Sequence, residues 1–464
     1  MMAELKPYPE YEASGLPWLK GLAPGWRILR GKGVFSAVDI RSQTGKEELL
    51  TVSVVNGVRP RSQQTVTMFM AKSYVGHKLC WPGDLVVNSL WAWMQGLGVA
   101  QHHGLISSAY SVYRPRRDFT DYANFFHYLL RSAVYKWELR TRSKGVWTSR
   151  LQLLDQAFMD MPIVLPPRKE QEAIVRFLDH ANGRIERAIQ AKKKLIALLN
   201  EQKQAIIHRA VTLGFDPNAR VKPSGSQWFP ELPEKWKALS LRRVINASID
   251  GPHFSPRYYD SGIPFLSARN VKADRWSLED AKFISEADYK EFCKRVRPEV
   301  GDVLYTKGGT TGVARAVDLT FRFQLWVHIA VLKLIRHRVT PEFLALCLNS
   351  PKCYEQSQLF TRGATNQDLG LGRMKEIELP VPPTLEEQTR IVEKLEMRLS
   401  SIKSVIARTE REIGLLREYR TRLISDVVTG KLDVREAASQ LPATFEEIPV
   451  VVADADELEE EAVA

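Results

Sequence analysis

"LPPRKEQEAIVRFL" (Leu165–Leu178) and "VPPTLEEQTRIVEKL" (Val381–Leu395) are two copies of one sequence pattern. Each copy places two prolines, a short charged spacer and Glu-Gln before an Ile-Val-x-x-Leu sequence, which predicts the start of a helix. From Glu-Gln onward the copies stay in register without a gap, at an offset of 217 residues. An internal repeat of this kind has more weight for the fold than any single motif.

The apolar residues after each Glu-Gln predict a long coiled-coil helix. They follow alternating steps of four and three, which is the 3.5-residue period of a coiled-coil seam. Lys192 and Thr409 interrupt the two seams, at a cost in stability that can fix the register. Each helix is expected to run for about 45 residues, or roughly 65 Å. The first predicted seam comprises Ile174, Leu178, Ala181, Ile185, Ala188, Leu195, Leu199 and Ile206, and the second Val392, Leu395, Leu399, Ile402, Ile406, Ile413, Leu416 and Leu423.

A second repeat precedes each globular region. "SGLPWLKGLAPGW" (Ser14–Trp26) matches "SGSQWFPELPEKW" (Ser224–Trp236), and "WPGDLVVN" (Trp81–Asn88) corresponds to "EVGDVLYT" (Glu299–Thr306). Runs of β-branched and aromatic residues between Gly, Pro and Asn predict strands mixed with a few helices, which is a mixed α/β fold. We predict seven segments: a Trp-containing segment (1–23), a first globular domain (24–162), a helical region (163–213), a second Trp-containing segment (214–236), a second globular domain (237–380), a second helical region (381–433) and an acidic, disordered tail (434–464).

Chain connectivity predicts how the two helices pair. A domain of about 165 residues has a radius of gyration near 15 Å, so it does not easily carry the chain back along a helix of roughly 65 Å. Parallel packing requires that return, whereas antiparallel packing does not. We therefore expect an antiparallel coiled coil with pseudo-two-fold symmetry and a cyclic arrangement, in which the end of the second helix lies near Ser14–Trp26.

Composition bounds the class of protein. The 464 residues are 44% hydrophobic and 26% charged, as in ordinary globular proteins, and the length suggests two or three domains. We find neither an apolar run of membrane-spanning length nor the layout of a signal peptide, and we expect a cytoplasmic protein. The four cysteines show no C-x-x-C spacing, which argues against a zinc site or a disulfide framework.

The net charge points to a polyanionic partner. It is +12 for the whole chain, although residues 443–464 hold eight acidic residues and no Lys or Arg. The rest of the chain therefore carries a larger positive surplus, which favours phosphate binding through counterion release. A generally soluble basic protein is the alternative on charge alone.

Two similar basic modules held at a fixed distance suit DNA half-sites that are separated by unread base pairs. The chain resembles the specificity subunits of type I restriction-modification systems. The resemblance rests on the repeated Pro-Pro, Glu-Gln and Ser-Gly-x-x-Trp patterns and extends from Ser14 to about Asp433. The resemblance implies double-stranded DNA as ligand. It also implies two adenine-N6 methyltransferase subunits and restriction-translocase subunits as partners. S-adenosylmethionine, ATP and Mg²⁺ would then belong to those partners, with no cofactor in this chain.

Catalytic motifs are missing from the sequence. There is no G-x-x-x-x-G-K-[ST] phosphate loop and no Asn-Pro-Pro-aromatic tetrapeptide of the kind that amino-methyltransferases use on a flipped base. His102-His103 has no second ligand pair at a metal-binding spacing. We therefore expect a non-catalytic DNA reader without a metal. A coiled-coil scaffold that organises proteins without reading DNA is the alternative.

Candidate DNA contacts are basic or amide side chains in glycine-containing loops, although each loop could instead be an ordinary turn. In the first domain they are Arg59, Arg61, Arg142, Lys144 and Arg150. In the second they are His253, Arg257, Tyr258, Lys307, Thr310, Thr311, Arg315, Arg362, Asn366, Gln367 and Arg373. Gly145 and Gly363 mark matching loops late in each domain. Trp91 and Trp93 are predicted to be core residues on a strand, with contact to DNA as the alternative. The polar helix faces, such as Gln190–Lys194, are candidate seats for methyltransferase subunits.

Overall fold

The computed structural model describes residues 5–63, 73–145, 151–363 and 367–442, and it divides into two compact units. The first unit comprises residues 1–192 and 411–464, and the second comprises residues 193–410. Two long helices, α5 (Arg168–Leu213) and α10 (Leu385–Val428), pass from one unit into the other.

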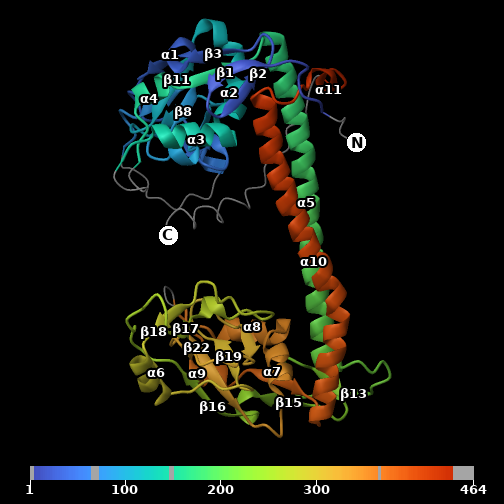
Figure 1. Ribbon diagram of the computed structural model, residues 1–464. Helices are drawn as coiled ribbons and strands as arrows, with labels where there is room; N and C mark the ends of the chain where they lie inside the picture. The colour runs from blue at the N-terminus through green and yellow to red at the C-terminus, as the bar shows by residue number, and fades with distance from the viewer. Residues whose placement is uncertain (1–4, 64–72, 146–150, 364–366, 443–464) are drawn as a thin grey trace. The chain divides into compact units, whose positions relative to one another are not determined.

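The first unit is built on a four-stranded antiparallel sheet with the strand order β4-β11-β8-β9. Besides parts of α5 and α10 it contains β1 Glu12–Leu16, β2 Leu19–Leu22, β3 Arg27–Arg30, α1 Gly31–Val34, β4 Phe35–Val38, β5 Leu50–Ser53, β6 Gly57–Pro60, η1 Arg61–Gln63, β7 Lys78–Cys80, β8 Leu85–Val87, η2 Ala92–Met94, β9 Leu97–Val99, β10 Gly104–Ile106, β11 Ser111–Pro115, η3 Arg117–Tyr122, α2 Ala123–Leu130, α3 Ala133–Arg142, α4 Asp155–Met159, β12 Pro162–Leu165 and α11 Arg435–Ser439. Figure 1 labels many of them.

Alternation along β8 buries both faces of that sheet. Leu85 and Val87 join the core formed with α2 and α3, whereas Val86 points to a second core beneath β5 and β6. Successive strand residues point to opposite faces, so a short continuous apolar run serves both cores. The sheet therefore lies between a helical layer and a layer of short hairpins.

The second unit repeats this frame with the strand order β16-β22-β19-β20. It contains β13 Val221–Pro223, β14 Glu231–Pro233, β15 Lys237–Ser240, η5 Leu241–Arg243, β16 Ile245–Asp250, β17 Ile263–Leu266, η6 Ala268–Asn270, β18 Lys282–Ile284, α6 Glu286–Cys293, β19 Val303–Thr306, β20 Ala314–Ala316, β21 Gln324–Leu325, β22 Ile329–Leu334, α7 Pro341–Leu348, α8 Pro351–Phe360, α9 Leu371–Met374 and β23 Glu378–Val381. The mixed α/β fold class is thus confirmed.

The repeated Gly-Asp pair starts the central strand of each sheet. Asp84 is buried, receives two hydrogen bonds from Arg114 at 2.7 and 2.8 Å, and accepts a third from the Trp81 amide. In the second unit Asp302 is equally buried and receives a hydrogen bond from Lys333 at 2.7 Å. The preceding glycines have φ values of +91° and +86°, which only glycine adopts readily.

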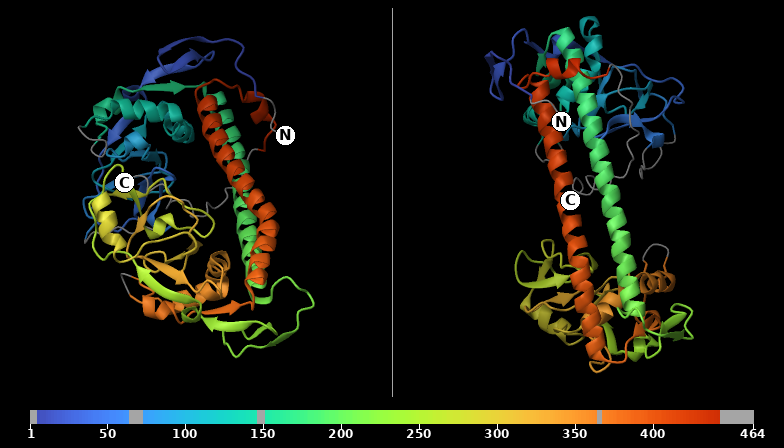
Figure 2. Two further views of the ribbon diagram at one scale, coloured as in Figure 1. Left: turned by 60° about the horizontal axis from the view of Figure 1, so that its bottom comes forward. Right: turned by 90° about the vertical axis from the view of Figure 1, so that its right-hand side faces the viewer.

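The long helices pack antiparallel, as the connectivity predicts. Lys192 pairs with Glu412 at 2.5 Å, and Glu186 pairs with Arg420 at 3.1 Å, so the α10 partner moves backward as α5 advances. Figures 1 and 2 show the two helices side by side. Their lengths, 46 and 44 residues, agree with the expected 45. The first seam is less continuous than predicted, because Leu195 is 43% exposed.

In each unit the repeated tryptophan connects the Trp-containing segment to the start of a long helix. The Trp26 indole N–H donates to Glu170 at the start of α5 at 2.8 Å, and the Trp236 indole donates to Glu387 at the start of α10 at 2.9 Å. A Cβ on Gly430, just beyond α10, would lie 3.3 Å from the Trp26 ring. The end of the second helix therefore lies against the first Trp-containing segment, which confirms the expected cyclic connectivity.

The glutamine of each Glu-Gln pair gives a matched test of stability. Gln388 is buried, accepts from the Thr340 amide at 2.9 Å and donates to the Arg338 carbonyl at 2.8 Å, whereas the buried Gln171 Oε1 has no partner. We expect Gln388→Leu to lower the free energy of unfolding by about 2 kcal/mol, because two backbone groups lose their partner. Gln171→Leu should cost less. Urea unfolding of both variants checks this, and equal losses would contradict it.

Ordered structure continues past the predicted boundary at Asp433. Val434 and Ala438, at α11, are fully buried in the core of the first unit, so the prediction of a disordered tail from residue 434 is wrong for residues 434–442. An apolar face that packs on the first unit stabilises this short helix. The acidic residues 443–464 lie outside the described residues. Across the described ranges, no helix is long and apolar enough to cross a membrane.

Candidate nucleic-acid interface

Each unit presents a pair of loops at one end of its central sheet. We call residues 88–96 and 306–313, which follow β8 and β19, strand loop 1 and strand loop 2. We call residues 143–153 and 361–369, which follow α3 and α8, helix loop 1 and helix loop 2. Residues 146–150 and 364–366 of the helix loops lie outside the described part of the chain.

Backbone hydrogen bonds show that the two pairs are equivalent. The Asn88 amide donates to the Gly96 carbonyl at 2.8 Å, and the Thr306 amide donates to Val313 at 2.8 Å, which closes each strand loop. The Leu153 amide donates to Ser89 at 2.9 Å. In the same way, the Leu369 amide donates to Lys307 at 2.8 Å. One frame therefore holds two loops together in each unit, although the loop sequences differ.

A cluster of charges in the second unit joins a third loop, residues 250–259, to this pair. Lys307 is only 7% exposed and donates to Asp368 of helix loop 2 at 2.9 Å, and its ammonium lies 3.5 Å from Asp250. Asp250 also accepts from Arg295, whose guanidinium lies 3.2 Å from His253. The charge of Lys307 is thus neutralised inside the site. Its ion pairs connect strand loop 2 with helix loop 2 and with the loop at residues 250–259.

The charges around Asp250 make its contribution to stability dependent on pH. Burial alone would raise the pKa of the Asp250 carboxyl, but the hydrogen bond from Arg295 and the charge of Lys307 outweigh burial and lower it. A carboxyl with a lowered pKa in the folded state stabilises the fold above its unfolded pKa, about 3.9. That stability is lost as the pH falls through the folded-state pKa.

We therefore expect wild-type chain to melt at a higher temperature than Asp250→Asn at pH 7, with the difference closing below about pH 4. Thermal melts by circular dichroism between pH 7 and pH 3 check this. A difference that persists undiminished to pH 3 would contradict the assignment.

The remaining predicted residues of the second unit fall into two groups. Arg315 packs against the protein and is largely shielded from solvent. Its guanidinium lies 4.9 Å from the centre of the Trp276 ring, and its side chain is 16% exposed. Thr311 is buried and accepts a hydrogen bond from Gln358, and Arg373 donates to the Phe360 and Asp368 carbonyls. The side chains that are exposed to solvent are His253, Arg257, Tyr258, Thr310, Arg362 and Gln367, while Asn366 lies outside the described residues.

In the first unit only part of the predicted set meets at the loops. Lys144 is exposed on helix loop 1, and Arg142 pairs with Glu138 at 2.6 Å just before it. Arg59 and Arg61 lie instead on β6 and η1, outside the loop pair. Arg150 falls outside the described residues. All of these contacts with DNA stay predictions.

The prediction for Trp91 and Trp93 is wrong. They do not lie in the core on a strand: Trp91 directly precedes the short 3-10 turn η2 in strand loop 1 and is 36% exposed, and Trp93 lies within that turn. An aromatic-rich run beside a strand predicts burial by composition alone, and only the position of the turn reveals the exposure. The signal available in the sequence was the correspondence of Trp81–Asn88 with Glu299–Thr306, which aligns the residues that follow.

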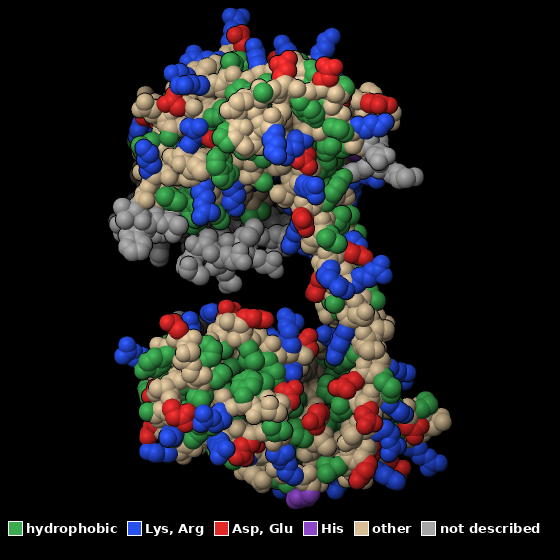
Figure 3. Space-filling view, viewed as in Figure 1, with side chains coloured by type: hydrophobic (Ala, Val, Ile, Leu, Met, Phe, Trp, Pro, Cys, Tyr) green, Lys and Arg blue, Asp and Glu red, His purple; other side chains and the backbone are tan. Residues whose placement is uncertain are grey.

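Charge does not mark the interface by itself. In Figure 3, Lys and Arg side chains are spread over the drawn face of each unit, with Asp and Glu between them. No group of three or more His, Cys, Asp or Glu side chains among the described residues could hold a metal ion.

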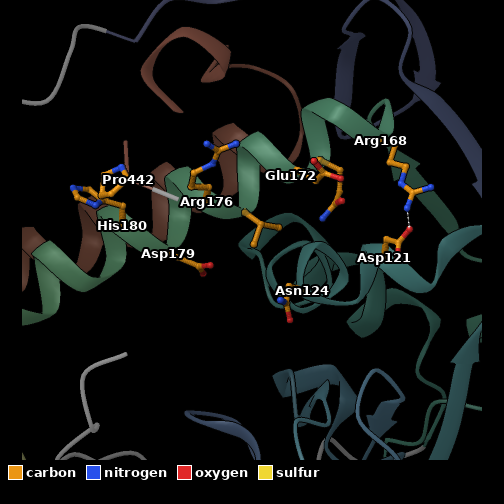
Figure 4. A pocket seen from close by; sticks show the side chains of 10 residues that line it. Asp121, Asn124, Arg168, Glu172, Arg176, Asp179, His180 and Pro442 are labelled. Carbon is orange, nitrogen blue, oxygen red and sulfur yellow. Dashed lines mark ion pairs between the residues drawn. The ribbon is translucent and has the colours of Figure 1, made fainter. Parts of the chain in front are cut away.

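A polar cleft of about 600 Å³ lies against α5 in the first unit, away from the loop pair in the sequence. Figure 4 shows Arg176, Asp179 and His180 projecting from α5, and Arg168 facing Asp121 as an ion pair. The side chain of Tyr128 donates to Asp179 at 2.5 Å. The cleft mixes both signs of charge, so it suits a polar protein surface better than a polyanion.

These features define a class of protein: a two-unit binder in which one repeated frame presents unlike loops and long paired helices join the units. Residues 233–408 match the family described as the type I restriction modification DNA specificity domain. The chain is 20% identical over 316 residues to the type I restriction enzyme EcoKI specificity subunit of Escherichia coli strain K12. That match covers 67% of this chain and 66% of the relative, just under two thirds of its length.

Similarity extends to an archaeal relative and to a solved structure. The MjaIX specificity subunit of Methanocaldococcus jannaschii is 20% identical, over 68% of this chain and 70% of that protein. A structure solved to explain complex assembly and conformational transition of the type I R-M system shares the fold. Its TM-score is 0.62 at 19% identity, and the match covers 89% of this chain and 99% of that one. Residues 233–408 of this chain therefore match the type I restriction modification DNA specificity domain, and the solved type I R-M structure shares the fold.

Proposed function

We propose that this chain is the DNA specificity subunit of a type I restriction-modification complex. Each unit reads one half of an asymmetric, bipartite site in double-stranded DNA, and the paired helices set the number of unread base pairs between the halves. The observation that carries the proposal is the loop pair, which is held by the same backbone hydrogen bonds in both units but filled with different residues. A repeated frame with unlike loops is what two unlike half-sites require.

Charge and similarity support the same proposal. The net charge of +12 favours binding to phosphates, and the exposed His253, Arg257, Arg362 and Gln367 can donate to phosphates or base edges. The curated relatives are named as specificity subunits of type I restriction enzymes. The alternative, a coiled-coil scaffold that does not read DNA, does not explain why the loops of the two units differ.

The partners in this proposal are two adenine-N6 methyltransferase subunits and the restriction-translocase subunits, in the cytoplasm. The partners would supply S-adenosylmethionine, ATP and Mg²⁺. The polar faces of α5 and α10 are the proposed binding surfaces for the methyltransferases. The cleft beside Arg176 and Asp179 lies on the α5 face. The solved relative was described in terms of complex assembly in a type I system.

Mapping of adenine methylation in cells that express this chain with a candidate methyltransferase partner tests the function. Methylation confined to one split, asymmetric motif is the expected result, and it would identify both half-sites. Unchanged methylation with the complex shown to be assembled would favour the coiled-coil scaffold instead.

A further inference from the structure

Strand loop 1 presents two tryptophans where strand loop 2 presents glycines. The sequences are "NSLWAWMQG" (88–96) and "TKGGTTGV" (306–313). The two loops leave equivalent strands and close on equivalent hydrogen bonds, so they occupy the same place in the frame. Residues in the second loop are already candidates for DNA contact, whereas nothing yet accounts for Leu90–Gln95 in the first.

Trp91 lies on the surface and stacks on the half-buried Trp93. The Trp91 and Trp93 ring centres are 6.2 Å apart with planes inclined by 15°, and the Trp93 indole donates to the Leu90 carbonyl. Trp91 is 36% exposed and Leu90 47%. Large apolar side chains gathered on one exposed turn indicate a binding surface rather than a core.

The turn that carries them is held rigidly. Gln95 has φ +68°, the only positive φ at a non-glycine position in the described ranges, and its side chain donates to the Ser132 carbonyl at 2.8 Å. The half-buried Arg131 donates to the carbonyls of Leu97 and Val54 at 2.6 and 2.7 Å. Strain that surrounding contacts maintain is a property of functional sites, and here it fixes the aromatic pair before any ligand arrives.

The surface beside strand loop 1 is basic and therefore favours a polyanionic ligand. Helix α3, which packs beside η2, exposes Lys136, Trp137 and Arg140. Its acidic residue, Glu138, is 5% exposed and accepts from Trp18 and Arg142, so it offers little negative charge to solvent. Flat apolar rings beside basic side chains suit the apolar base edges in a groove of duplex DNA, such as the thymine methyl group, and the adjoining phosphates.

We infer that Trp91 and Trp93 form a base-contacting element for the first half-site in duplex DNA, with Lys136 and Arg140 on the adjoining phosphates. The inference rests on the proposed function and deepens it. The two kinds of contact have different physical signatures. Apolar contact with base edges contributes affinity that salt does not screen, whereas each phosphate contact steepens the dependence of affinity on salt. The first half-site is therefore read partly by aromatic contact, and the second by polar side chains and loop backbone.

Selection from a random-sequence duplex library, with the full chain assembled with its methyltransferase subunits, tests the assignment. We expect wild-type complex to recover a bipartite motif. The Trp91→Ala/Trp93→Ala variant should lose sequence preference in one half and keep the other, while Trp91→Phe should keep both. The retained half shows that the variant is folded and assembled. An unchanged motif, or equal loss in both halves, would overturn the inference while leaving the proposed function in place. A wild-type complex without any motif would overturn both.

Salt titration of the recovered duplex separates the two contact types. We expect Trp91→Ala to weaken binding by about tenfold or more with an unchanged slope of log affinity against log salt. Lys136→Gln/Arg140→Gln should flatten that slope by about 1 to 2. If Trp91→Ala instead flattened the slope, or left affinity unchanged, the assignment of Trp91 to an apolar base contact would be wrong.

Discussion

Three heptads inserted into both long helices should lengthen the unread spacer by about nine base pairs and leave both half-site sequences unchanged. Twenty-one residues add roughly 32 Å of helix, close to the 34–36 Å of one DNA turn, so the second half-site returns to nearly the same side of the duplex. Insertion after Lys192 in α5 and before Glu412 in α10 preserves their ion pair and the heptad phase. Methylation mapping or selection from random duplexes reads the spacer directly.

Two controls isolate the spacing. A single heptad in both helices adds roughly 10 Å, or about three base pairs, which turns the second half-site by about a third of a turn around the duplex. Binding should therefore be weaker at every spacer length. Three heptads in α5 alone destroy its register with α10 and should prevent assembly. An unchanged spacer in the doubly extended protein would show that the helices do not set the distance.

Lys307→Met should have the second large effect, on stability and on recognition together. It leaves Asp250 and Asp368 without their shared cation, and removal of one partner from a buried ion pair typically costs about 3–5 kcal/mol. Because Arg295 remains bound to Asp250, we expect the lower end of that range. The three loops lose their common attachment, so preference for one half-site should also disappear.

The matched control is Lys333→Met. Lys333 pairs with the buried Asp302 at 2.7 Å, and Asp302 precedes β19 whereas Lys307 follows it, so the two pairs lie at opposite ends of one strand. We expect a comparable loss of stability with both half-site sequences retained. Urea unfolding and duplex selection on both variants measure the two effects. Retained recognition in Lys307→Met would show that the charge cluster does not position the loops.

The repeats carried most of the fold prediction. The gapless register after Glu170-Gln171 and Glu387-Gln388 predicts two long helices, and the connection between them predicts antiparallel pairing, because both follow from geometry along the chain. The match of Trp81–Asn88 with Glu299–Thr306 pairs two equivalent strands, and only the structure shows that both lie inside their sheets. The periodicity predicted Leu195 to lie in the coiled-coil seam, but this residue is exposed. The spacing of apolar residues does not show whether the other helix places a side chain against each of them.

The candidate site was less predictable from sequence, because exposure depends on tertiary packing. Lys307 has the sequence signature of a surface loop, yet two aspartates from distant segments bury it. Trp91 has the signature of a core residue, yet it lies on a surface turn. Loop sequences report which chemistry is available, while the frame decides which side chains face outward.

The contrast between a strained aromatic turn and a glycine turn has a thermodynamic consequence. In strand loop 1 the conformational entropy is lost during folding, because Gln95 and Arg131 already hold the turn. In strand loop 2, Gly309 has no heavy atom within 4 Å of the Cβ position, so the backbone there is open to close approach by a ligand. Changes in the first half-site should therefore alter the heat capacity of binding through apolar burial. Changes in the second should alter the balance of enthalpy and entropy. The affinities for the two half-sites would then depend differently on temperature.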